Sequence, residues 1–456
     1  EKVKSYGVRE INITNHLDNV KKRLSLPEFP SIIKGLRETT NQNHLSEHLS
    51  KGVLRAVHNL NVNKDGTIRY DMSEMSLTQF KPNEVYTPVA KLRELGYDKD
   101  IYGNELVDDN QILLLKPQDV VLPGCTGSPE EGADVAMFKI ANFIDDLLVN
   151  FYGLKPYYNL KNKKDIIGHL IISLAPHTSA GIIGRIVGFS DTQGCYAHPL
   201  WHSAQRRDCD GDENGIMLMM DGFLNFSRHF LPAHRGATQD ACLVLSSKLI
   251  PSEVDDMVFN MDVVWSYPLE FYEACEKFKE PYDIKIEQLK DNLGSPKEFT
   301  QYGYTHPVKN INSGVIYSAY KFLPTMGEKV KGQMSLACKI RAVDEDDVAR
   351  LVIERHFLRD LKGNLRKFSM QQFRCVACNE KFRRPPLAGN CTACGGRLLF
   401  TISEGSVVKY WDKIVKLSDE YKLPVYSQQS IDILKKRLES VFMKDPEIQS
   451  ALNEFM

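Results

Sequence analysis

The run RRDCDGDEN, residues 206–214, contains three aspartates at alternate positions, Asp208, Asp210 and Asp212, and apolar sequence flanks it on both sides. In an extended segment, alternate side chains point to the same side, so the three carboxylates are expected to converge. Like charges at such short range repel one another unless a cation lies between them. Carboxylate oxygens are the ligands that Mg²⁺ or Mn²⁺ prefers, and such an ion holds and polarises phosphate oxygens. The run therefore predicts a divalent-metal site.

The other residues of this run bear on the same prediction. Gly211 removes a side chain where the loop must turn or a substrate backbone must approach, and Arg206 and Arg207 are placed to contact phosphate. A bare alternation of aspartates also fits a solvated acidic turn, but the apolar flanks argue against it. A calcium loop fits poorly, because the glycine comes too early and no bidentate glutamate follows. Cys209, between two aspartates, is expected to point to the opposite face and pack.

A second pattern lies near the C-terminus, where Cys375-x-x-Cys378 is followed by Cys391-x-x-Cys394 and two glycines. Each CxxC turn presents two thiolates, and the doubled spacing is typical of a zinc ribbon. Two disulfides or a redox CxxC are the alternatives, which the compartment and the doubled spacing disfavour. Four thiolate ligands leave no open position, so a structural Zn²⁺ is expected rather than a catalytic one.

The charge of the chain is uneven. Its formal net charge is −1, but residues 361–410 carry nine Lys and Arg against two Glu. Local basic surface of this kind is typical of phosphate binding. Lys381, Arg383 and Arg384 lie between the two CxxC pairs, and we expect them to contact a nucleic-acid backbone or a partner subunit.

Length and composition predict a multidomain globular protein. The chain has 456 residues, 42% hydrophobic and 26% charged, which indicates about two to four domains. No uninterrupted apolar stretch is long enough to cross a membrane. The chain opens with Glu1 rather than Met, which indicates a processed chain or a piece of a longer one. The six scattered cysteines are expected to be reduced thiols in a cytoplasm.

Hydrophobic periodicity and turn residues predict the local elements. They are a partly helical start within residues 1–50; a β-hairpin over residues 52–72 with its turn at Asn63–Gly66; two short buried strands within residues 110–122; a helix over residues 132–151; a buried strand running into a helix after the aspartate run; mostly helix over residues 251–360; and a helical tail from residue 427.

The stretch HSAQRRDCDGDENGIMLMMDGFLNFSRHFLP, residues 202–232, resembles the signature of the large subunit of archaeal family D DNA polymerase. The usual form of the metal run in that family is RRNCDGDED. The resemblance continues in KGVLRAVHNLNVNKDGTIRYD, IGHLIISLAPHTSAGIIGRIVGF and FRCVACNEKFRRPPLAGNCTACGG, and it covers about residues 50 to 430. Such a long match is highly specific.

The resemblance implies a fold and a division into domains. It implies an α+β multidomain chain, with a double-psi β-barrel of the two-barrel polymerase superfamily, helical insertions and a C-terminal zinc ribbon. The expected domains are an N-terminal mixed segment with a β-hairpin (1–80), the second catalytic barrel region (81–250), a helical region (251–360), the zinc ribbon (361–410) and a helical tail (411–456).

It also implies a reaction, namely template-directed DNA synthesis by two-metal nucleotidyl transfer on primer-template DNA and deoxynucleoside triphosphates. The family's metal-binding aspartates fall on Asp210 and Asp212. Asp208 stands where the family has Asn, and Asn214 where it has Asp. This brings the run closer to the DFDGD of multisubunit RNA polymerases, so Asp208 is expected to be a third ligand. An RNA-synthesising enzyme and a non-catalytic zinc-bearing docking scaffold remain as alternatives.

The implied partners are a small subunit carrying a 3′→5′ exonuclease, a sliding clamp, and an upstream first barrel with catalytic lysines, so that this chain holds half of an active site. The protein is expected in the cytoplasm, associated with the nucleoid. His177, placed at a helix N-terminus, and Arg185 are expected to contact nucleic acid, while His202 fits either a substrate contact or a core histidine. The last expected site is a clamp-binding turn, with packing of the tail as the alternative, formed by Gln449, Leu452, Phe455 and Met456.

Overall fold

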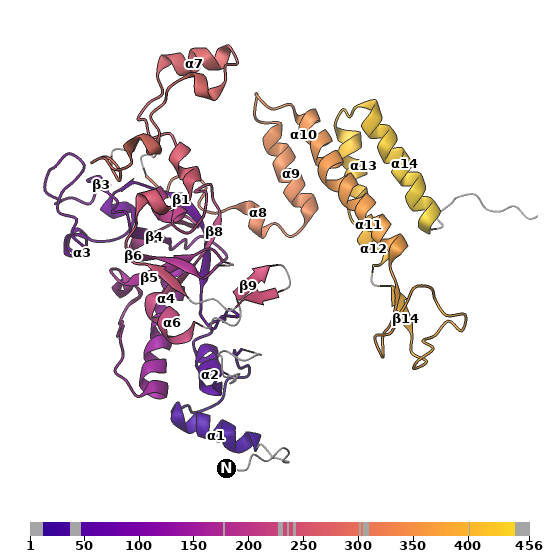
Figure 1. Ribbon diagram of the computed structural model, residues 1–456, viewed down its shortest axis with the longest axis horizontal. Coiled ribbons are helices and arrows are strands. Elements are labelled where there is room, and N and C mark those ends of the chain that lie inside the picture. The colour runs from indigo at the N-terminus through magenta and orange to yellow at the C-terminus, as the bar shows by residue number, and fades with distance from the viewer. Residues whose placement is uncertain are drawn as a thin grey trace, which may run out of the picture. The chain divides into compact units, whose positions relative to one another are not determined.

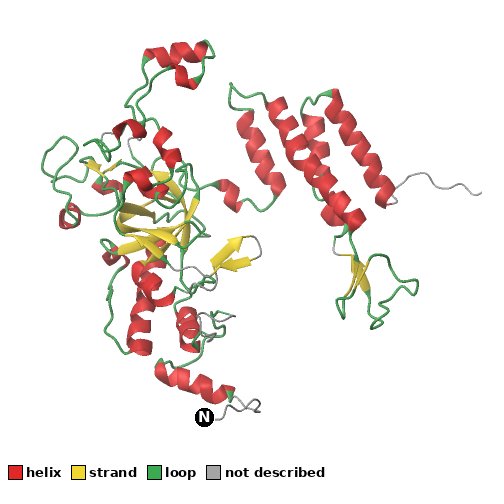
Figure 2. Cartoon of the chain, viewed as in Figure 1, coloured by secondary structure: helices red, strands yellow, loops and turns green. Residues whose placement is uncertain are grey.

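The computed structural model describes residues 12–36, 47–176, 178–226, 231–234, 237–239, 243–300, 302–303, 310–400 and 402–442. The chain divides into two compact units, Glu1–Ser318 (unit 1) and Ala319–Met456 (unit 2). The boundary falls inside the segment 251–360 that the sequence analysis treats as one helical region. Figures 1 and 2 show a mixed sheet surrounded by helices in unit 1, and helices with a small ribbon in unit 2.

Unit 1 contains most of the strands. Its helices are α1 (Ile13–Arg23), α2 (Leu49–Val57), α3 (Val89–Glu94), α4 (Ala133–Asp146), the π-helical turn η2 (Leu147–Tyr152), α5 (Pro199–Ser203), α6 (Met219–Asn225) and α7 (Leu269–Glu276). Its 3₁₀ turns are η1 (Pro82–Glu84), η3 (Lys163–Ile166), η5 (Pro251–Glu253), η6 (Asp256–Asn260), η7 (Pro281–Asp283) and η8 (Leu289–Asn292). Its strands are β1 (Tyr70–Ser76), β2 (Gln79–Phe80), β3 (Leu113–Leu114), β4 (Asp119–Pro123), β5 (Leu170–Leu174), β6 (Ala180–Ser190), β7 (Gly194–Ala197), β8 (Glu213–Leu218), β9 (Leu231–His234), β10 (Ala237–Gln239) and β11 (Val244–Ser246).

Six of these strands close into a ring. The large sheet has the order β11-β6-β4-β7-β1-β8-β5, and β5 also pairs with β6, which joins the two ends. The pairs β1–β7 and β4–β6 are parallel, whereas β1–β8, β4–β7, β5–β6 and β5–β8 are antiparallel. Closure removes most free strand edges, and β11 adds a seventh, parallel strand to the first residues of β6.

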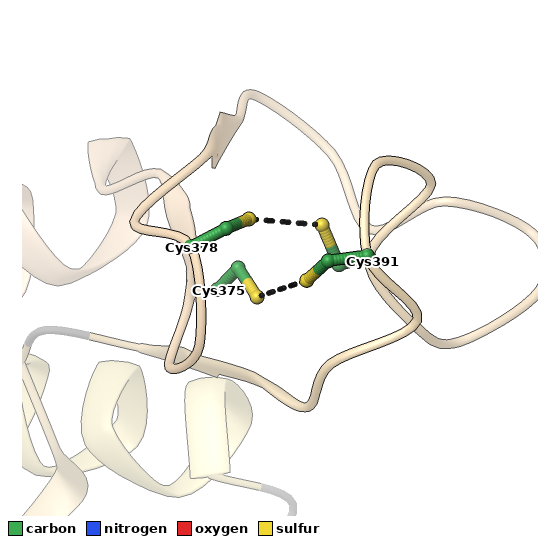
Figure 3. Close-up of side chains that lie close together, drawn as sticks. Cys375, Cys378 and Cys391 are labelled. Carbon is green, nitrogen blue, oxygen red and sulfur yellow. Dashed lines mark hydrogen bonds between the residues drawn. The ribbon is translucent and has the colours of Figure 1, made fainter.

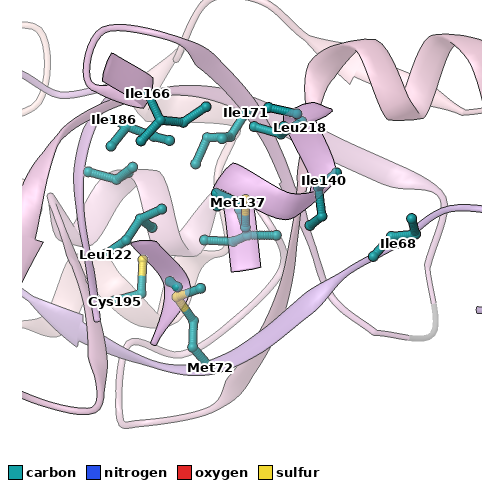
Figure 4. Close-up of a cluster of buried hydrophobic side chains, with 14 of the residues drawn as sticks. Ile68, Met72, Leu122, Met137, Ile140, Ile166, Ile171, Ile186, Cys195 and Leu218 are labelled. Carbon is teal, nitrogen blue, oxygen red and sulfur yellow. The ribbon is translucent and has the colours of Figure 1, made fainter. Parts of the chain in front are cut away.

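The ring encloses the main core of unit 1. Figure 4 shows Met72, Leu122, Ile171 and Ile186 from four strands, gathered with Met137 from α4. Each of these side chains is at least 96% buried, and full burial of such a side chain contributes about 1.5–3 kcal/mol to folding. Strands β4 and β6 are almost continuously buried, which explains why their sequences read as apolar blocks rather than alternating strands.

One local prediction is wrong in part. Residues 52–57 belong to helix α2 and not to the first arm of a hairpin. Val53 and Leu54 are buried on this helix, and its apolar residues pack in the core beside α4. The apolar pattern of residues 52–57 fits a strand or a helix, and this tertiary packing favours the helix. The turn itself is confirmed, since the Gly66 amide donates to the Asn63 carbonyl at 2.9 Å and Gly66 has φ +91°.

Other local predictions are confirmed. Strands β3 and β4 lie within residues 110–122 and just beyond, α4 and η2 occupy the helix expected over residues 132–151, and β8 runs directly into α6. Within the described residues, no helix is both long enough and apolar enough to cross a membrane.

Within its described residues, unit 2 is mainly helical and contains a ribbon of three short strands in the order β13-β12-β14. Its own apolar core includes Ile353, Leu361, Ile414 and Leu434. Its elements are α8 (Ala319–Phe322), α9 (Met326–Ala337), α10 (Glu345–Leu351), the π-helical turn η9 (Val352–Phe357), α11 (Leu358–Met370), β12 (Phe373–Cys375), β13 (Lys381–Phe382), β14 (Leu398–Phe400), α12 (Glu404–Val408), α13 (Trp411–Glu420) and α14 (Val425–Phe442).

Candidate metal centre

Strand β1 carries an acidic residue at an inward-facing position. Glu74 has the same parity along β1 as the core residue Met72, and both are buried. It lies opposite Cys195 of the parallel strand β7. Its backbone amide donates to the Asp212 carbonyl at 2.9 Å, which continues the β1–β8 ladder into the aspartate run. The ladder therefore fixes the run beside Glu74.

The aspartate run is a loop between α5 and β8, and not the extended segment that the alternation predicts. Positive φ angles at Arg206 (63°), Cys209 (67°) and Gly211 (104°) bend it. A Cβ atom on Gly211 would meet nothing within 4 Å, so the glycine serves the backbone conformation. Because the chain turns at Cys209 and Gly211, the simple alternation argument does not apply to the three aspartates.

The structure brings three carboxylates together, and they are Glu74, Asp210 and Asp212. Each offers an oxygen that lies within 4.8 Å of the other two. Glu74 is buried, Asp212 is half-buried and Asp210 is exposed, so one side of the group opens to solvent. Oxygen donors of this kind suit Mg²⁺ or Mn²⁺. The chain can therefore hold a hard divalent cation with Asp210, Asp212 and Glu74.

Asp208, expected as a third ligand, lies outside this group among the described residues. Desolvation and the negative charges of Asp210 and Asp212 raise the pKa of Asp208. The sequence analysis missed Glu74, which is 136 residues before Asp210 along the chain. The sequence feature that could have identified Glu74 is its position two residues after Met72 in a strand, because residues two apart in a strand point to the same face.

A buried histidine, His202, lies next to Glu74. His202 of α5 and Glu74 are both fully buried, and the His202 Nδ1 atom lies 3.2 Å from the Glu74 Oε2 atom. The His202 Nε2 atom lies 3.2 Å from the Met75 carbonyl, to which it can donate. The Glu74 Oε1 atom accepts from the Cys209 amide at 3.2 Å. His202 is thus a buried core residue next to Glu74, which agrees with the core alternative predicted from the sequence, and neither the His202 Nδ1 atom nor the Glu74 Oε2 atom has a hydrogen-bond partner among the described residues.

The arginines of the run differ in their partners. The Arg207 Nη1 atom donates to the Asp212 Oδ2 atom at 3.2 Å, and its Nη2 atom to the Glu213 carbonyl at 2.8 Å. Arg207 therefore steadies one of the three carboxylates. Arg206 is exposed. The Cys209 thiol contacts Ser203 and the Pro199 carbonyl of α5, which agrees with the expected packing role.

Arg185 is engaged inside unit 1. Its Nε and Nη2 atoms donate to the two oxygens of Asp119 at 2.8 and 2.7 Å, and Nη2 also donates to the Leu95 carbonyl. This bidentate pair raises the pKa of Arg185. Tyr97 donates to the same carboxylate at 2.5 Å. Arg185 therefore links β6 to β4 through its ion pair with Asp119. His177, the other expected contact, lies outside the described residues.

The four cysteines of the ribbon converge. The Cys375 and Cys394 sulfurs are 3.4 Å apart, and the Cys378 and Cys391 sulfurs 3.6 Å. Figure 3 shows these thiols facing one another from two loops. All four sulfurs lie within 4.8 Å of one another, a spacing compatible with tetrahedral ligands at about 2.3 Å from one Zn²⁺. Donation from the Cys378 amide lowers the pKa of Cys375, which favours the thiolate that a metal binds, whereas the neighbouring thiols raise the pKa of Cys378 and Cys394.

The basic residues expected to bind phosphate on the ribbon are exposed. Lys381 begins β13, and Arg383 and Arg384 follow it. The expected clamp-binding residues Gln449, Leu452, Phe455 and Met456 lie outside the described residues.

Comparison with known families settles the relationship of the chain. The family described as "DNA polymerase II large subunit DP2, catalytic domain" matches residues 27–329, which include β1, the aspartate run and the closed ring of strands. The chain belongs to this family. The membership agrees with the resemblance seen in the sequence.

Relatives within the DNA polymerase II large subunit family match beyond the catalytic domain. The chain is 48% identical over 436 residues to the DNA polymerase II large subunit of Archaeoglobus fulgidus, with 95% of this chain and 38% of that protein covered. It is 46% identical over 443 residues to that of Pyrococcus furiosus, with 97% and 34% covered. For that of Methanothermobacter thermautotrophicus the identity is 44% over 452 residues, with 99% and 41% covered. The chain thus spans about two fifths or less of the length of these relatives.

Proposed function

We propose that this chain supplies the metal-binding half of the active site of a template-directed DNA polymerase. The observation that carries the proposal is the group of three carboxylates, Glu74, Asp210 and Asp212, at one end of a closed ring of strands. The names of the relatives support the polymerase assignment. Because nucleotidyl transfer depends on divalent ions that hold phosphate oxygens, converging carboxylates are the feature such an enzyme needs.

In this proposal Asp210 and Asp212 bind Mg²⁺ directly, and Glu74 completes the group from the core side. Bound Mg²⁺ would lower the pKa of the primer 3′-hydroxyl and neutralise charge on the triphosphate. The chain's own residues do the rest. Arg207 orients Asp212, the Cys209 amide orients Glu74, and exposed Arg206 is placed to attract phosphate.

The ring of strands fits the double-psi β-barrel that the sequence resemblance implies. Its six strands, with two parallel and four antiparallel pairings, support this proposal. We propose further that the first barrel, with catalytic lysines, is contributed by another part of the large subunit. The group of carboxylates described here would then meet those lysines only in the assembled enzyme.

The proposed partners follow from the same family membership. They are primer-template DNA, deoxynucleoside triphosphates, a small subunit with 3′→5′ exonuclease activity, and a sliding clamp contacted by residues 449–456. We propose that Zn²⁺ occupies the four-cysteine ribbon, and that the enzyme works in the cytoplasm on the nucleoid. RNA synthesis and a purely structural role are the competing functions.

Substitution of the aspartates in the assembled enzyme tests the proposal. We expect Asp210→Ala and Asp212→Ala each to lower primer extension about a thousandfold or more, since a lost metal ligand removes several kcal/mol of transition-state stabilisation. Asp208→Asn should retain most activity, because Asp208 lies outside the carboxylate group. Normal extension by an Asp210→Ala,Asp212→Ala double variant would exclude this site, and incorporation of ribonucleotides in preference to deoxyribonucleotides would favour RNA synthesis.

A further inference from the structure

Unit 2 contains a cleft of about 640 Å³ that is separate from its zinc ribbon. Helices α8 and α9, the continuous helix formed by η9 and α11, and Tyr410 line it. Helices α8, α9 and α11 are labelled in Figure 1. Three cations line the cleft, Arg355, Arg359 and Lys367, together with His356. The proposed polymerase reaction gives this cleft no role.

The three cations are free of carboxylate partners in the described part of the chain. All three are exposed. The ion pairs found in described unit 2 use Arg350 and Lys416 instead. The acidic residue in the lining is Asp360, and its Oδ2 atom accepts a hydrogen bond from Asn364 at 3.0 Å. The cleft therefore keeps an unneutralised positive charge, which attracts anions.

Helix α11 forms part of the wall of the cleft and has a glycine, Gly363, at one of the positions that line it. Arg359, Gly363 and Lys367 follow one another at four-residue intervals along α11 and all line the cleft, so Arg359 and Lys367 are about 12 Å apart along the helix axis. A Cβ atom on Gly363 would meet nothing within 4 Å. Glycine is a poor residue for a helix interior, and here it leaves open space between two cations where a ligand backbone can approach.

Two tyrosines add aromatic surface. Tyr320 and Tyr410 both line the cleft. The Lys329 Nζ atom lies 4.2 Å from the centroid of the Tyr320 ring, and the Lys409 Nζ atom lies 4.9 Å from that of the Tyr410 ring, so each ring is also next to a cation. The Tyr410 ring rests on Phe357 with centroids 5.2 Å apart and an interplanar angle of 30°, which holds it in place. Cations spaced along a groove and combined with aromatic rings are the arrangement that binds single strands, because phosphates contact the cations and bases stack on the rings.

We propose that this cleft is a binding site for single-stranded nucleic acid. Arg355 and Arg359 contact neighbouring phosphates, Lys367 contacts a phosphate farther along the strand beyond the open surface at Gly363, and a base packs against Tyr410 or Tyr320. The alignment of the three cations along one helix and the presence of rings favour a nucleic acid over an acidic protein segment, which has no bases to stack. The site is independent of the carboxylate group in unit 1.

Charge reversal in the full chain tests this assignment. Binding of a fluorescein-labelled mixed-sequence single-stranded DNA is followed by anisotropy over a series of salt concentrations, without added Mg²⁺ or nucleotide. The test variant is Arg355→Glu,Arg359→Glu,Lys367→Glu. The control is Lys435→Glu,Lys436→Glu,Arg437→Glu on α14, which makes the same change in charge at exposed residues outside the cleft.

We expect the cleft variant to bind at least about tenfold more weakly, and its salt slope to fall by about 2, because each lost phosphate contact on a single strand removes about 0.7. The control should change by about twofold at most. A second variant, Gly363→Leu, fills the open space at this position without altering charge and favours the helix, so it should weaken binding severalfold while the thermal stability stays the same or rises.

Equal weakening by the cleft and control variants would overturn the proposal, because it would show non-specific attraction. Unchanged DNA binding combined with loss of a partner subunit would overturn it too, and would make the cleft a protein interface. Neither result bears on the proposed polymerase site, which is tested separately by primer extension with the Asp210 and Asp212 variants.

Discussion

A carboxylate inside a protein core is stable only where hydrogen bonds or opposite charge replace its lost water. For Glu74, the Cys209 amide donates to the Oε1 atom at 3.2 Å and so joins the side chain to the loop that carries Asp210 and Asp212. The Oε2 atom lies 3.2 Å from the His202 Nδ1 atom but has no hydrogen-bond partner among the described residues. A cation held by the carboxylate group would compensate the charge on this oxygen. The burial of Glu74 is therefore consistent with the proposed metal site.

Glu74→Gln tests this role. Glutamine keeps the shape and an acceptor for the Cys209 amide but loses the charge, so we expect the fold to persist and the Mg²⁺ requirement of primer extension to rise about tenfold or more. The measurement is a Mg²⁺ titration of activity in the assembled enzyme. Glu213→Gln, at an exposed neighbouring position on β8, is the matched control. A titration curve that coincides with that of the wild type would remove Glu74 from the metal site.

Asp221 of α6 gives a pH-dependent prediction. Burial raises the pKa of Asp221 from 3.8 to about 6, although the Ile68 amide and the Asn225 side chain donate to it. Between these values the folded chain binds the proton more tightly than the unfolded chain. The contribution of Asp221 to stability is therefore greatest below 3.8 and is lost as the pH rises through 6, a change of about 3 kcal/mol.

Asp221→Asn should flatten this part of the stability profile, because asparagine keeps an acceptor for the Ile68 amide and does not titrate. The measurement is the free energy of unfolding of both proteins at about pH 4.5 and about pH 7.5. The wild type should lose more stability than the variant between the two conditions. Parallel losses would show that Asp221 titrates normally in the folded chain.

At the scale of single elements, the sequence predicted those whose pattern is local. The strand-to-helix passage from β8 to α6 and the helix α4 follow from their own apolar periodicity. The segment 52–57 could not be assigned in this way, because six mostly apolar residues fit a strand or a helix equally well. Its helical state depends on packing with α4, which is distant in sequence.

The four-cysteine ribbon shows the opposite case, in which local sequence determines an element that has little core. Within residues 373–400 the buried residues are Cys375 and Cys391 alone. Three strands of two or three residues cannot hold such a segment together by apolar burial. We therefore expect the metal that the two CxxC pairs predict to supply most of the stability of the ribbon.

We expect one tightly bound Zn²⁺ per chain, and its removal to unfold the ribbon while the rest of the chain persists. Elemental analysis gives the stoichiometry, and thiol labelling of the native protein before and after chelation reports the four cysteines. Cys378→Ser should lower zinc occupancy strongly, whereas Cys275→Ser, at an exposed thiol of α7 outside the cluster, should leave it unchanged. Absence of zinc, or four freely reactive thiols before chelation, would contradict the prediction.

At the scale of the whole molecule, the candidate site depends on contacts between distant parts of the chain. Asp210 and Asp212 were found from the sequence because they share one loop with an informative spacing. Glu74 was missed because only the β1–β8 and β1–β7 pairings bring it there, and pairings between distant strands leave no local signal. The loop also turns at Gly211, so the alternation of the aspartates does not predict their positions. The group consequently contains Glu74 and not Asp208.

The proposed division of the active site gives the last prediction. In the proposal, the catalytic lysines belong to a first barrel in another part of the large subunit, so the carboxylate group described here would supply only the metal ligands. We therefore expect this chain alone to extend no primer. Addition of the large-subunit part that carries the first barrel should restore extension. The restored activity should be lost again with Asp210→Ala in this chain, and retained with Lys435→Ala, a distant exposed residue of unit 2. Extension by the isolated chain at the level of the assembled enzyme would show that the carboxylate group needs no second barrel.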